Sequence, residues 1–234
     1  MPGEIAHSFT SERTLTLNRT RRAQSEDSYN SNRIYCVNTL IELESESMTE
    51  PRMLGVSRVL ITPEELRDRI AEMAHELDEE YGNDLPIIVG VLNGAIMFMA
   101  DLIREMSIAL EIDFMAVSSY GDSTRSSGVV QIIKDLSKSI EGRRVIIIED
   151  IVDSGLTLKY LIDNLLSRNP ADLRVVVLLS KWPLGSAPVQ HDTVGFVIPD
   201  EFVVGYGLDF AGRYRNLPFV GIFDPDSIPS ESAR

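Results

Sequence analysis

Cysteine is almost absent from this sequence, which contains only Cys36, and the three histidines, His7, His75 and His191, lie far apart. One cysteine cannot form an internal disulfide framework or a cysteine-rich zinc site. The histidines show no metal-ligand spacing, so a histidine-based metal centre is not predicted. This composition is typical of proteins in a reducing compartment, and we expect a cytoplasmic localisation.

Positive charge is also scarce. The chain has 22 Lys and Arg residues against 36 Asp and Glu residues, which gives a formal net charge of -14. Nucleic acid-binding proteins need clustered Lys and Arg side chains to contact the phosphate backbone, so we expect no nucleic acid partner. A small phosphorylated ligand is still compatible with this charge, because it needs only a few local donors.

No long hydrophobic run is present. The longest apolar stretch, residues 87–100, carries Asn93 and two glycines and is too short to cross a membrane. The N-terminus lacks the short apolar core of a signal peptide, and we expect no membrane partner. Hydrophobic residues nevertheless make up 44% of the 234 residues, which is enough for the core of one domain with appendages.

The N-terminal segment, residues 1–52, differs from the rest of the chain. It is rich in Ser, Thr, Asn and Arg and has no sustained hydrophobic periodicity. Such a segment buries too little apolar surface to offset the entropy of ordering, so we expect a disordered extension. Residues 34–44 are the exception and could form a short strand or helix. A transit peptide is disfavoured by the acidic residues, and a translation start at Met48 or Met53 is a further alternative.

The globular pattern starts near Val56. Thr62 as N-cap, Pro63 at the first helical position and Glu65 three residues after the cap predict a helix start with a capping box. Gly82 is predicted to end this helix.

Apolar strands and amphipathic helices then alternate. Strands are predicted at 86–92, 110–120, 129–135, 142–150 and 171–180, and helices at 94–107 and 155–170. This alternation indicates an α/β fold with a mostly parallel central sheet flanked by helices. Trp182, which follows the last of these strands, is interpreted as a packing residue.

One segment, VIIIEDIVDSGLTL at residues 145–158, combines features that favour a ligand site. Its apolar strand brings Glu149 and Asp150 to the carboxyl edge of the sheet, where ligands bind in open α/β folds. The next residues lead into a helix N-terminus, where unpaired N–H groups and the helix dipole favour phosphate. This predicted phosphate loop consists of Asp153, Ser154, Gly155, Leu156 and Thr157.

A phosphate site beside carboxylates suits a phosphorylated sugar, because ribose hydroxyls donate to carboxylates and Mg2+ binds both carboxylates and phosphates. Two other interpretations compete. Receiver domains also carry acidic residues at strand ends, but the glycine and hydroxyls here favour holding a phosphate over accepting one. A solvated acidic turn fits poorly between an apolar strand and an amphipathic helix. The Walker A pattern is absent.

The same segment resembles the signature of type I phosphoribosyltransferases. Four further segments occur in the order typical of the hypoxanthine-guanine group of that family: VGVLNGAIMF, SSYGDSTRSSG, LLSKWP and VGFVIPDEFVVGYGLDFAGRYRNLPFVGIF. The resemblance covers residues 56–225. It implies the type I phosphoribosyltransferase fold over residues 53–228, with a small base-binding hood formed in part by the C-terminal segment, and a flexible tail at 229–234.

The resemblance also implies an activity. The family transfers the 5-phosphoribosyl group from phosphoribosyl pyrophosphate (PRPP) to hypoxanthine or guanine, giving IMP or GMP and pyrophosphate in purine salvage. By this resemblance Glu149 and Asp150 contact the ribose hydroxyls, and residues 153–157 hold the 5′-phosphate. Asp153 is the expected general base or acid near purine N7. The expected ligands of Mg2+ are Glu149, Asp150 and Asp209.

Further roles follow from the resemblance alone. The purine site is expected to consist of Lys181 on the 6-oxo group, Phe202 stacked on the base, the backbone of Val203, and Asp209. Pyrophosphate is expected to bind Leu92, Asn93, Gly94 and Arg215, and Ser119 and Tyr120 are expected to begin a mobile loop over the reacting centre. A homodimer or homotetramer is also implied.

The chain departs from the family at one position. The pyrophosphate loop usually carries Leu-Lys-Gly, and this sequence has Leu92-Asn93-Gly94. Asn93 keeps amide donors but lacks the positive charge. The family has a nonproline cis peptide bond at this place, which a sequence cannot reveal.

Two alternative functions remain open at this stage. A regulator on the same fold would bind PRPP and a nucleic acid element, and the net charge of -14 disfavours it. A phosphoribosyltransferase that prefers xanthine or another base is the closer alternative.

Overall fold

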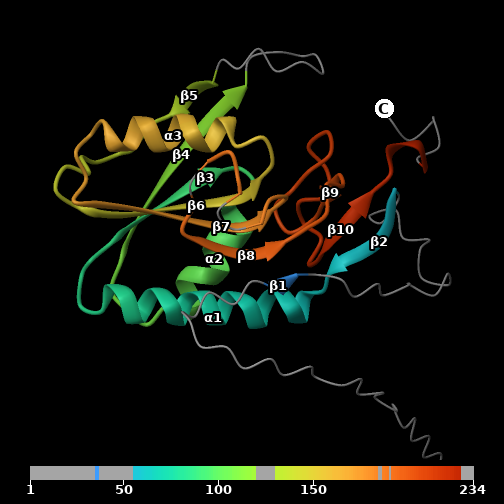
Figure 1. Ribbon diagram of the computed structural model, residues 1–234, viewed down its shortest axis with the longest axis horizontal. Coiled ribbons are helices and arrows are strands. Elements are labelled where there is room, and N and C mark those ends of the chain that lie inside the picture. The colour runs from blue at the N-terminus through green and yellow to red at the C-terminus, as the bar shows by residue number, and fades with distance from the viewer. Residues whose placement is uncertain (1–34, 37–54, 120–129, 184–185, 190, 228–234) are drawn as a thin grey trace, which may run out of the picture. The chain divides into compact units, whose positions relative to one another are not determined.

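The computed structural model describes residues 35–36, 55–119, 130–183, 186–189 and 191–227, which all belong to one compact unit, Asn32–Arg234. Figure 1 shows the elements in chain order. They are β1 (Tyr35–Cys36), β2 (Val56–Ile61), α1 (Pro63–Tyr81), β3 (Ile87–Leu92), α2 (Ile96–Glu105), β4 (Glu111–Ser119), β5 (Val130–Lys134), β6 (Arg144–Val152), α3 (Leu156–Leu166), β7 (Asp172–Ser180), β8 (Thr193–Val197), β9 (Val203–Val204), β10 (Val220–Phe223) and a 3-10 helix (Pro225–Ser227).

The large sheet has seven strands in the order β1-β8-β7-β6-β3-β4-β5. Each neighbouring pair is parallel except β4 and β5, which are antiparallel. Central parallel strands are buried on both faces and therefore need apolar residues in succession. The sequences IIVGVL in β3 and VIII at the start of β6 meet this need. The predicted α/β fold with a mostly parallel sheet is confirmed.

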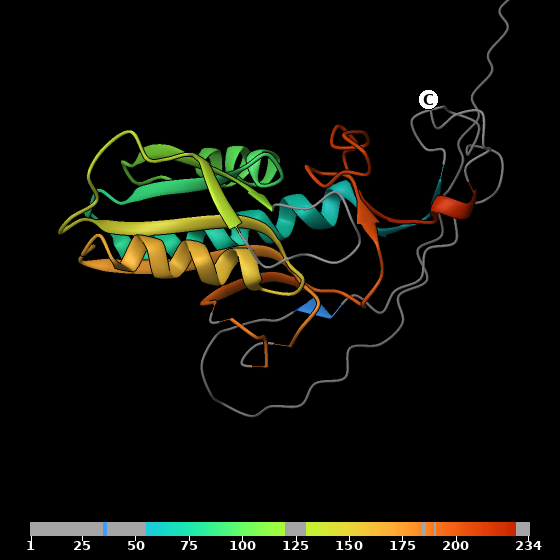
Figure 2. The same cartoon turned by 90° about the horizontal axis from the view of Figure 1, so that it is seen from above.

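Helices cover both faces of this sheet (Figures 1 and 2). α1 and α2 pack on one face, over a core that includes Leu66, Met73, Phe98 and Ile148. α3 packs on the other face, over a second core that includes Leu161. No helix in the described ranges has the length and hydropathy to cross a membrane.

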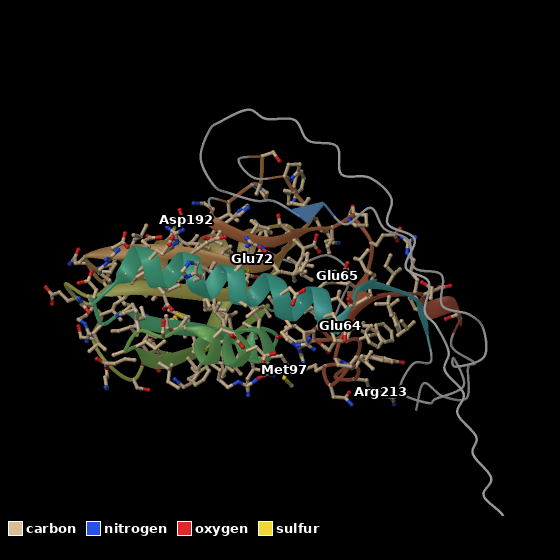
Figure 3. All side chains as sticks on the ribbon, turned by 90° about the horizontal axis from the view of Figure 1, so that it is seen from below. Glu64, Glu65, Glu72, Met97, Asp192 and Arg213 are labelled. Carbon is tan, nitrogen blue, oxygen red and sulfur yellow. The ribbon has the colours of Figure 1, made fainter. Side chains whose placement is uncertain are left out.

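The start of α1 follows the predicted capping box. The N–H of Glu65 donates to Thr62 Oγ1 at 3.2 Å, and the N–H of Thr62 donates to Glu65 Oε2 at 2.9 Å. Two donors that lack helical partners are thereby satisfied. Figure 3 shows Glu64 and Glu65 at the end of α1 that follows β2. Gly82 ends the helix with a φ of 54°, in the region that favours glycine.

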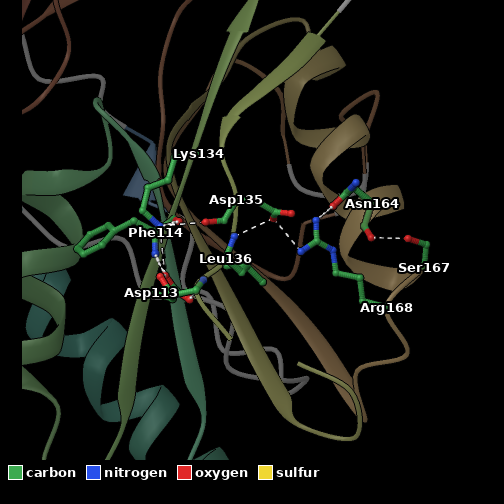
Figure 4. Close-up of polar contacts among 9 residues, drawn as sticks. Asp113, Phe114, Lys134, Asp135, Leu136, Asn164, Ser167 and Arg168 are labelled. Atoms are coloured by element: carbon green, nitrogen blue, oxygen red, sulfur yellow. Dashed lines mark hydrogen bonds and ion pairs between the residues drawn. The ribbon is translucent and has the colours of Figure 1, made fainter. Parts of the chain in front are cut away.

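The antiparallel edge strand β5 is fixed by polar contacts (Figure 4). Lys134 at its end donates to the carbonyl oxygen of Phe114 in β4 at 2.7 Å. The next residue, Asp135, forms an ion pair with Arg168 at 2.7 Å, just after α3. Burial of Asp135 is modest, and the hydrogen bond from Arg168 is the main reason why its pKa is lowered. These contacts fix the C-terminal end of β5 to β4 and to the end of α3.

A second sheet of three antiparallel strands has the order β2-β10-β9. We call β2 together with residues 198–223 the hood. The C-terminal part of the hood was expected from the sequence, but the participation of β2 was not. β2 immediately precedes α1, so the hood joins a segment near the start of the domain to its last strands.

Several predicted element ends are wrong by two or more residues, among them those of α2, β6 and α3. β6 extends to Val152, two residues beyond the predicted end, because β7 is long enough to pair with it as far as Val152 opposite Ser180. Glu149 and Asp150 lie in the strand, as predicted, and the predicted phosphate loop begins directly after its end. α3 ends at Leu166 instead of residue 170.

Within the expected N-terminal extension, residues 35–36 form β1 and pair with β8. The rest of residues 1–52 and the expected tail at 229–234 lie outside the described residues.

Candidate active site

The carboxyl ends of β6 and β7 and the hood enclose a cavity of about 160 Å³. Six residues that the sequence predicted as site residues line it together: Asp150, Asp153, Lys181, Phe202, Val203 and Asp209. They are spread over 60 positions of the chain and meet because β6, β7 and the hood converge. Ile151, Glu201 and Leu208 complete the lining and were not predicted.

Glu149 and Asp150 place two carboxyl groups at the end of a buried strand. Glu149 is 8% exposed, and its Oε2 atom has no hydrogen-bond partner among the described residues. Burial first, and then the charge of Asp150, raise the pKa of Glu149 well above its usual value. Buried carboxylates of this kind require a cation or hydrogen-bond donors. A ribose diol or a divalent cation would supply what Glu149 lacks.

Asp150, unlike Glu149 Oε2, has a hydrogen-bond donor and charged groups close to its carboxylate. Burial raises its pKa to about 6, against the opposing effects of the Ile151 N–H group and the Arg215 charge, while the charge of Asp209 raises it further. The Ile151 N–H donates to Asp150 Oδ1 at 2.8 Å. Its other oxygen, Oδ2, lies against Gly94, where an added β-carbon would approach it to 1.6 Å. The predicted ribose site and the predicted pyrophosphate loop are therefore in contact.

The phosphate loop joins β6 to α3. Gly155 adopts a left-handed backbone with a φ of 74°, and an added β-carbon would lie 2.9 Å from Val189 Cγ1. Among the described residues no side chain of the N-cap position caps α3, and the Leu156 N–H makes only a long contact of 3.5 Å to Ser154 Oγ. The first N–H groups of a helix lack partners within the helix, so an anion can accept from them here.

Lys181 lies between two carboxylates. Its Nζ atom is 2.8 Å from Asp200 Oδ1 and 3.3 Å from Asp153 Oδ1. Burial lowers the pKa of Lys181, but the hydrogen bonds and charges of Asp200 and Asp153 outweigh this effect, and the pKa is raised. Lys181 is therefore a cation at neutral pH, placed at the cavity next to the proposed base, Asp153.

Trp182 was interpreted as a packing residue, which is wrong: its side chain is 42% exposed. Its Nε1–H group donates to the carbonyl oxygen of Asp153 at 2.7 Å. Ser180 accepts from the Trp182 N–H at 3.1 Å and donates to the Trp182 carbonyl oxygen at 2.8 Å. The strand end of β7 thus holds the backbone of the phosphate loop. Spacing and hydropathy carry no signal for such a contact.

The ring of Phe202 is held at the cavity with half of its surface exposed, 50%. Phe210 and Phe223 contact it, each with a centroid distance of 6.0 Å. The carbonyl oxygen of Phe202 accepts from the N–H of Phe223 at 2.8 Å, which fixes its backbone to β10. An aromatic ring in this state offers a surface on which a flat base can stack.

Gly94 and Arg215, which the resemblance assigns to pyrophosphate, are linked through Gly207 of the hood. The Leu92–Asn93 peptide bond is cis, as in the family. Arg215 donates to the carbonyl oxygen of Gly207 at 2.6 Å and forms an ion pair with Asp209 at 2.6 Å. Gly207 in turn lies on Gly94: an added β-carbon at Gly207 would approach the Gly94 oxygen to 2.1 Å.

A preassembled metal site of three or more acidic, His or Cys side chains is not found in the described ranges. The two oxygens of Asp209 already contact Arg215 and the Gly212 N–H. Mg2+ usually binds proteins through one or two carboxylates and takes its other ligands from substrate phosphates and water. Glu149 Oε2, which has no partner in the described part of the chain, and the neighbouring Asp150 fit such a mode of binding.

Two predicted residues cannot be placed in the site. Ser119 is the last residue of β4, and Tyr120 lies outside the described residues. The expected mobile loop is therefore an expectation from the sequence alone.

The fold and the site define a class of protein. Residues 57–211 match the sequence model of the family described as "Phosphoribosyl transferase domain", and the chain belongs to the phosphoribosyltransferase family. The resemblance found in the sequence, and the fold that it implied, are confirmed.

The chain is similar to particular members of the hypoxanthine-guanine group. It is 52% identical over 170 residues to the hypoxanthine-guanine phosphoribosyltransferase of Bacillus subtilis (strain 168), covering 73% of this chain and 94% of that protein. The enzyme of the same name from Mycobacterium tuberculosis (strain ATCC 25618 / H37Rv) is 50% identical over 177 residues, covering 73% and 87%. A crystal structure of a hypoxanthine phosphoribosyltransferase from Staphylococcus aureus superposes with a TM-score of 0.71 at 44% identity, covering 77% and 98%.

Proposed function

We propose that this chain transfers the 5-phosphoribosyl group from PRPP to hypoxanthine or guanine, as a cytoplasmic enzyme of purine salvage. The observation that carries the proposal is the pairing of Lys181 with Asp153 at a cavity whose other wall is the Phe202 ring. A cation, a carboxylate and an aromatic surface around one small cavity suit a flat base with a carbonyl group and an exchangeable proton.

Lys181 would read the 6-oxo group of the base. Its Nζ atom can donate to a carbonyl oxygen but cannot accept from an amino group, so adenine would leave the cation unpaired. A site built to hydrogen-bond one group rejects an analogue that lacks it much more strongly than a hydrophobic pocket would. The neighbouring Phe202 ring would stack on the base, and the Val203 backbone would contact its edge.

PRPP would bind along the edge of the large sheet. The N–H groups at the start of α3, with Ser154 and Thr157, would hold the 5′-phosphate. Glu149 and Asp150 would accept from the ribose hydroxyls. Asn93, Gly94 and Arg215 would bind the pyrophosphate. Glu149, Asp150 and Asp209 would also hold Mg2+, which stabilises the charge of the leaving pyrophosphate when it is bound.

In the transfer, the bond from ribose C1′ to the pyrophosphate oxygen breaks, and its electron pair leaves with pyrophosphate. The lone pair of purine N9 forms the new bond to C1′. The proton on N7 then goes to the carboxylate of Asp153, the general base. Arg215 stabilises the charge of the departing pyrophosphate. The loop that begins at Ser119 and Tyr120 would close over the centre and exclude water, which would otherwise hydrolyse the sugar.

The proposal is tested with a panel of bases. The purified full chain is incubated with PRPP, Mg2+ and either hypoxanthine, guanine, xanthine or adenine, and nucleotide formation is measured by chromatography. IMP and GMP are expected, with no AMP and with activity lost in a chelator. XMP as the main product would show that the enzyme prefers xanthine to hypoxanthine and guanine. PRPP binding without any nucleotide, together with a salt-dependent shift of DNA or RNA, would support the regulator instead.

The assembly is part of the proposal. The resemblance implies a homodimer or homotetramer with no nucleic acid partner, and light scattering on the purified chain measures the mass. A monomer with full activity would contradict it.

A further inference from the structure

A tight turn of the hood, residues 205–208, contacts the loop that is proposed to bind pyrophosphate. The N–H of Gly205 donates to the Leu208 oxygen at 3.1 Å, and the N–H of Leu208 donates to the Gly205 oxygen at 3.0 Å. Tyr206 and Gly207 are the two residues between, with φ angles of 49° and 103°. Turns of this kind favour Asn-Gly, because both central residues are left-handed. A tyrosine at the first position is unfavourable and needs an explanation.

Tyr206 is anchored at both ends. Its backbone N–H donates to the Leu217 oxygen at 2.9 Å, and its hydroxyl donates to the carboxylate of Asp101 in α2. The side chain is only 9% exposed. Burial, and after it the hydrogen bond and charge of Asp101, raise the pKa of Tyr206. The phenol therefore stays protonated and remains a donor over the pH range of enzyme assays.

The other central residue of the turn contacts the pyrophosphate loop. Gly207 lies so close to the Gly94 oxygen that a β-carbon would approach it to 2.1 Å. Its own carbonyl oxygen accepts from Arg215 at 2.6 Å, and its N–H donates to the Arg215 oxygen at 3.0 Å. One turn thus holds two elements that the proposed function assigns to pyrophosphate binding.

Asp101 belongs to the helix that follows the same loop. α2 begins at Ile96, two residues after Gly94, and Asp101 lies in its second turn. The hydroxyl of Tyr206 therefore connects the hood turn to the helix that follows Leu92, Asn93 and Gly94. Tyr206 and Asp101 also line a cavity of about 360 Å³ together with residues of α1.

We propose that Tyr206 is a positioning residue for the pyrophosphate end of the site. Its hydrogen bond to Asp101 holds the turn of residues 205–208 against Gly94 and keeps the Arg215 guanidinium in place. The unfavourable backbone of Tyr206 is explained by this role, because asparagine is too short to reach α2. The inference rests on the proposed function, since it concerns the binding of PRPP and pyrophosphate.

The test compares two tyrosine-to-phenylalanine variants. Tyr206→Phe removes the hydroxyl and keeps the ring. Tyr81→Phe is the matched control: Tyr81 is 2% exposed, and its hydroxyl donates to Asp172 at 3.4 Å, at the start of β7 and thus at the opposite edge of the sheet. KM for PRPP, KM for hypoxanthine, turnover and the melting temperature are measured for each variant, and KM for pyrophosphate is measured in the reverse direction.

Tyr206→Phe is expected to raise KM for PRPP and for pyrophosphate by about tenfold, the effect of losing one hydrogen bond to a charged group. KM for hypoxanthine should stay near the wild-type value. Tyr81→Phe should change the melting temperature but none of the three KM values. Asp101→Asn, which keeps an acceptor, should be close to wild type, whereas Asp101→Ala should behave like Tyr206→Phe.

Equal KM values for PRPP in the two phenylalanine variants would overturn the inference about Tyr206. The proposed function would still stand in that case if the wild-type chain forms nucleotide. An increase of KM for both PRPP and hypoxanthine in Tyr206→Phe would also overturn the inference. A general loss of hood structure would then explain the result without a specific positioning role. A wild-type chain that forms no nucleotide would overturn the proposed function and this inference with it.

Discussion

The sheet wall of the cavity is formed by Asp150, Ile151 and Asp153 at the end of β6 and by Lys181 after β7, whereas the hood wall is formed by residues 201–203, Leu208 and Asp209. In the sheet wall, a buried parallel strand fixes the carboxylates, and burial raises the pKa values of Glu149 and Asp150. In the hood wall, turns with left-handed residues such as Tyr206 and Ala211 fix the side chains, and Arg215 is paired with Asp209.

This difference has a consequence for function. Groups on a rigid sheet edge keep their geometry when a single side chain is changed, so a substitution there should remove only the role of that side chain. Groups in the hood depend on one another, so substitutions there should alter the KM of one substrate. The predictions that follow test this division.

The largest effect is expected for Asp153→Asn. The amide keeps the shape and the loop but cannot take the N7 proton, so turnover should fall by about 10²–10⁴ while PRPP affinity is nearly preserved. Steady-state turnover with hypoxanthine and calorimetric PRPP binding with Mg2+ measure the two effects. Asp200→Asn is the matched control, because Asp200 is the other carboxylate on Lys181 and has no proposed proton role. Near-normal turnover of Asp153→Asn would remove it from the acid–base role.

Lys181→Ala should separate base recognition from PRPP binding. It removes the donor to a desolvated carbonyl, a loss of about 1–3 kcal/mol, and should raise KM for hypoxanthine far more than KM for PRPP. Lys159→Ala is the control, since Lys159 is paired with Asp163 on the exposed side of α3. Equal effects of Lys181→Ala on both substrates would place the lysine elsewhere in the reaction.

The ionised carboxylate of Asp150 at the sheet edge is expected to lower the stability of the folded chain. Its folded-state pKa is raised to about 6, above the usual 3.8, so the folded chain binds more protons than the unfolded chain between these values. The contribution of Asp150 to the free energy of unfolding is therefore greatest below about pH 4 and is lost as the pH rises to about 6.

Asp150→Asn cannot ionise. At pH 7.5 in metal-free buffer, it should be more stable than the wild type by about 1–3 kcal/mol and should bind PRPP weakly. Urea unfolding at several pH values between 4 and 7.5 measures the first effect, with the exposed Asp163→Asn as control. A variant whose stability falls with pH as steeply as that of the wild type would show that Asp150 is not the group responsible.

The smallest effect is expected for Asn93→Lys. It restores the charge that is usual in the family beside a polyanion, and KM for PRPP should fall by a few-fold, about the effect of one partly exposed ion pair. Steady-state kinetics at low and high salt measure it, because screening should reduce the gain. An unchanged or higher KM would indicate that Arg215 already supplies the needed cation.

Local patterns in the sequence predicted much of the fold. The capping box at Thr62, the apolar runs of β3 and β6 and the glycine after Asp153 each act within a few residues, so the sequence alone indicates them. The ends of β6 could not be predicted, because they depend on how far β7 pairs with it. The contribution of β2 to the hood could not be predicted either, since its partner β10 lies more than 150 residues away.

The site shows the same division. The sequence by itself determined that carboxylates, a phosphate loop, a lysine and an aromatic residue occur in a family order, because those features are carried by short motifs. Only the tertiary structure decided that Lys181 pairs with Asp153, that Trp182 holds the Asp153 backbone and that Tyr206 reaches Asp101. Such contacts join residues far apart in the chain, and their geometry is set by the packing of β6, β7, α2 and the hood, which no local pattern encodes.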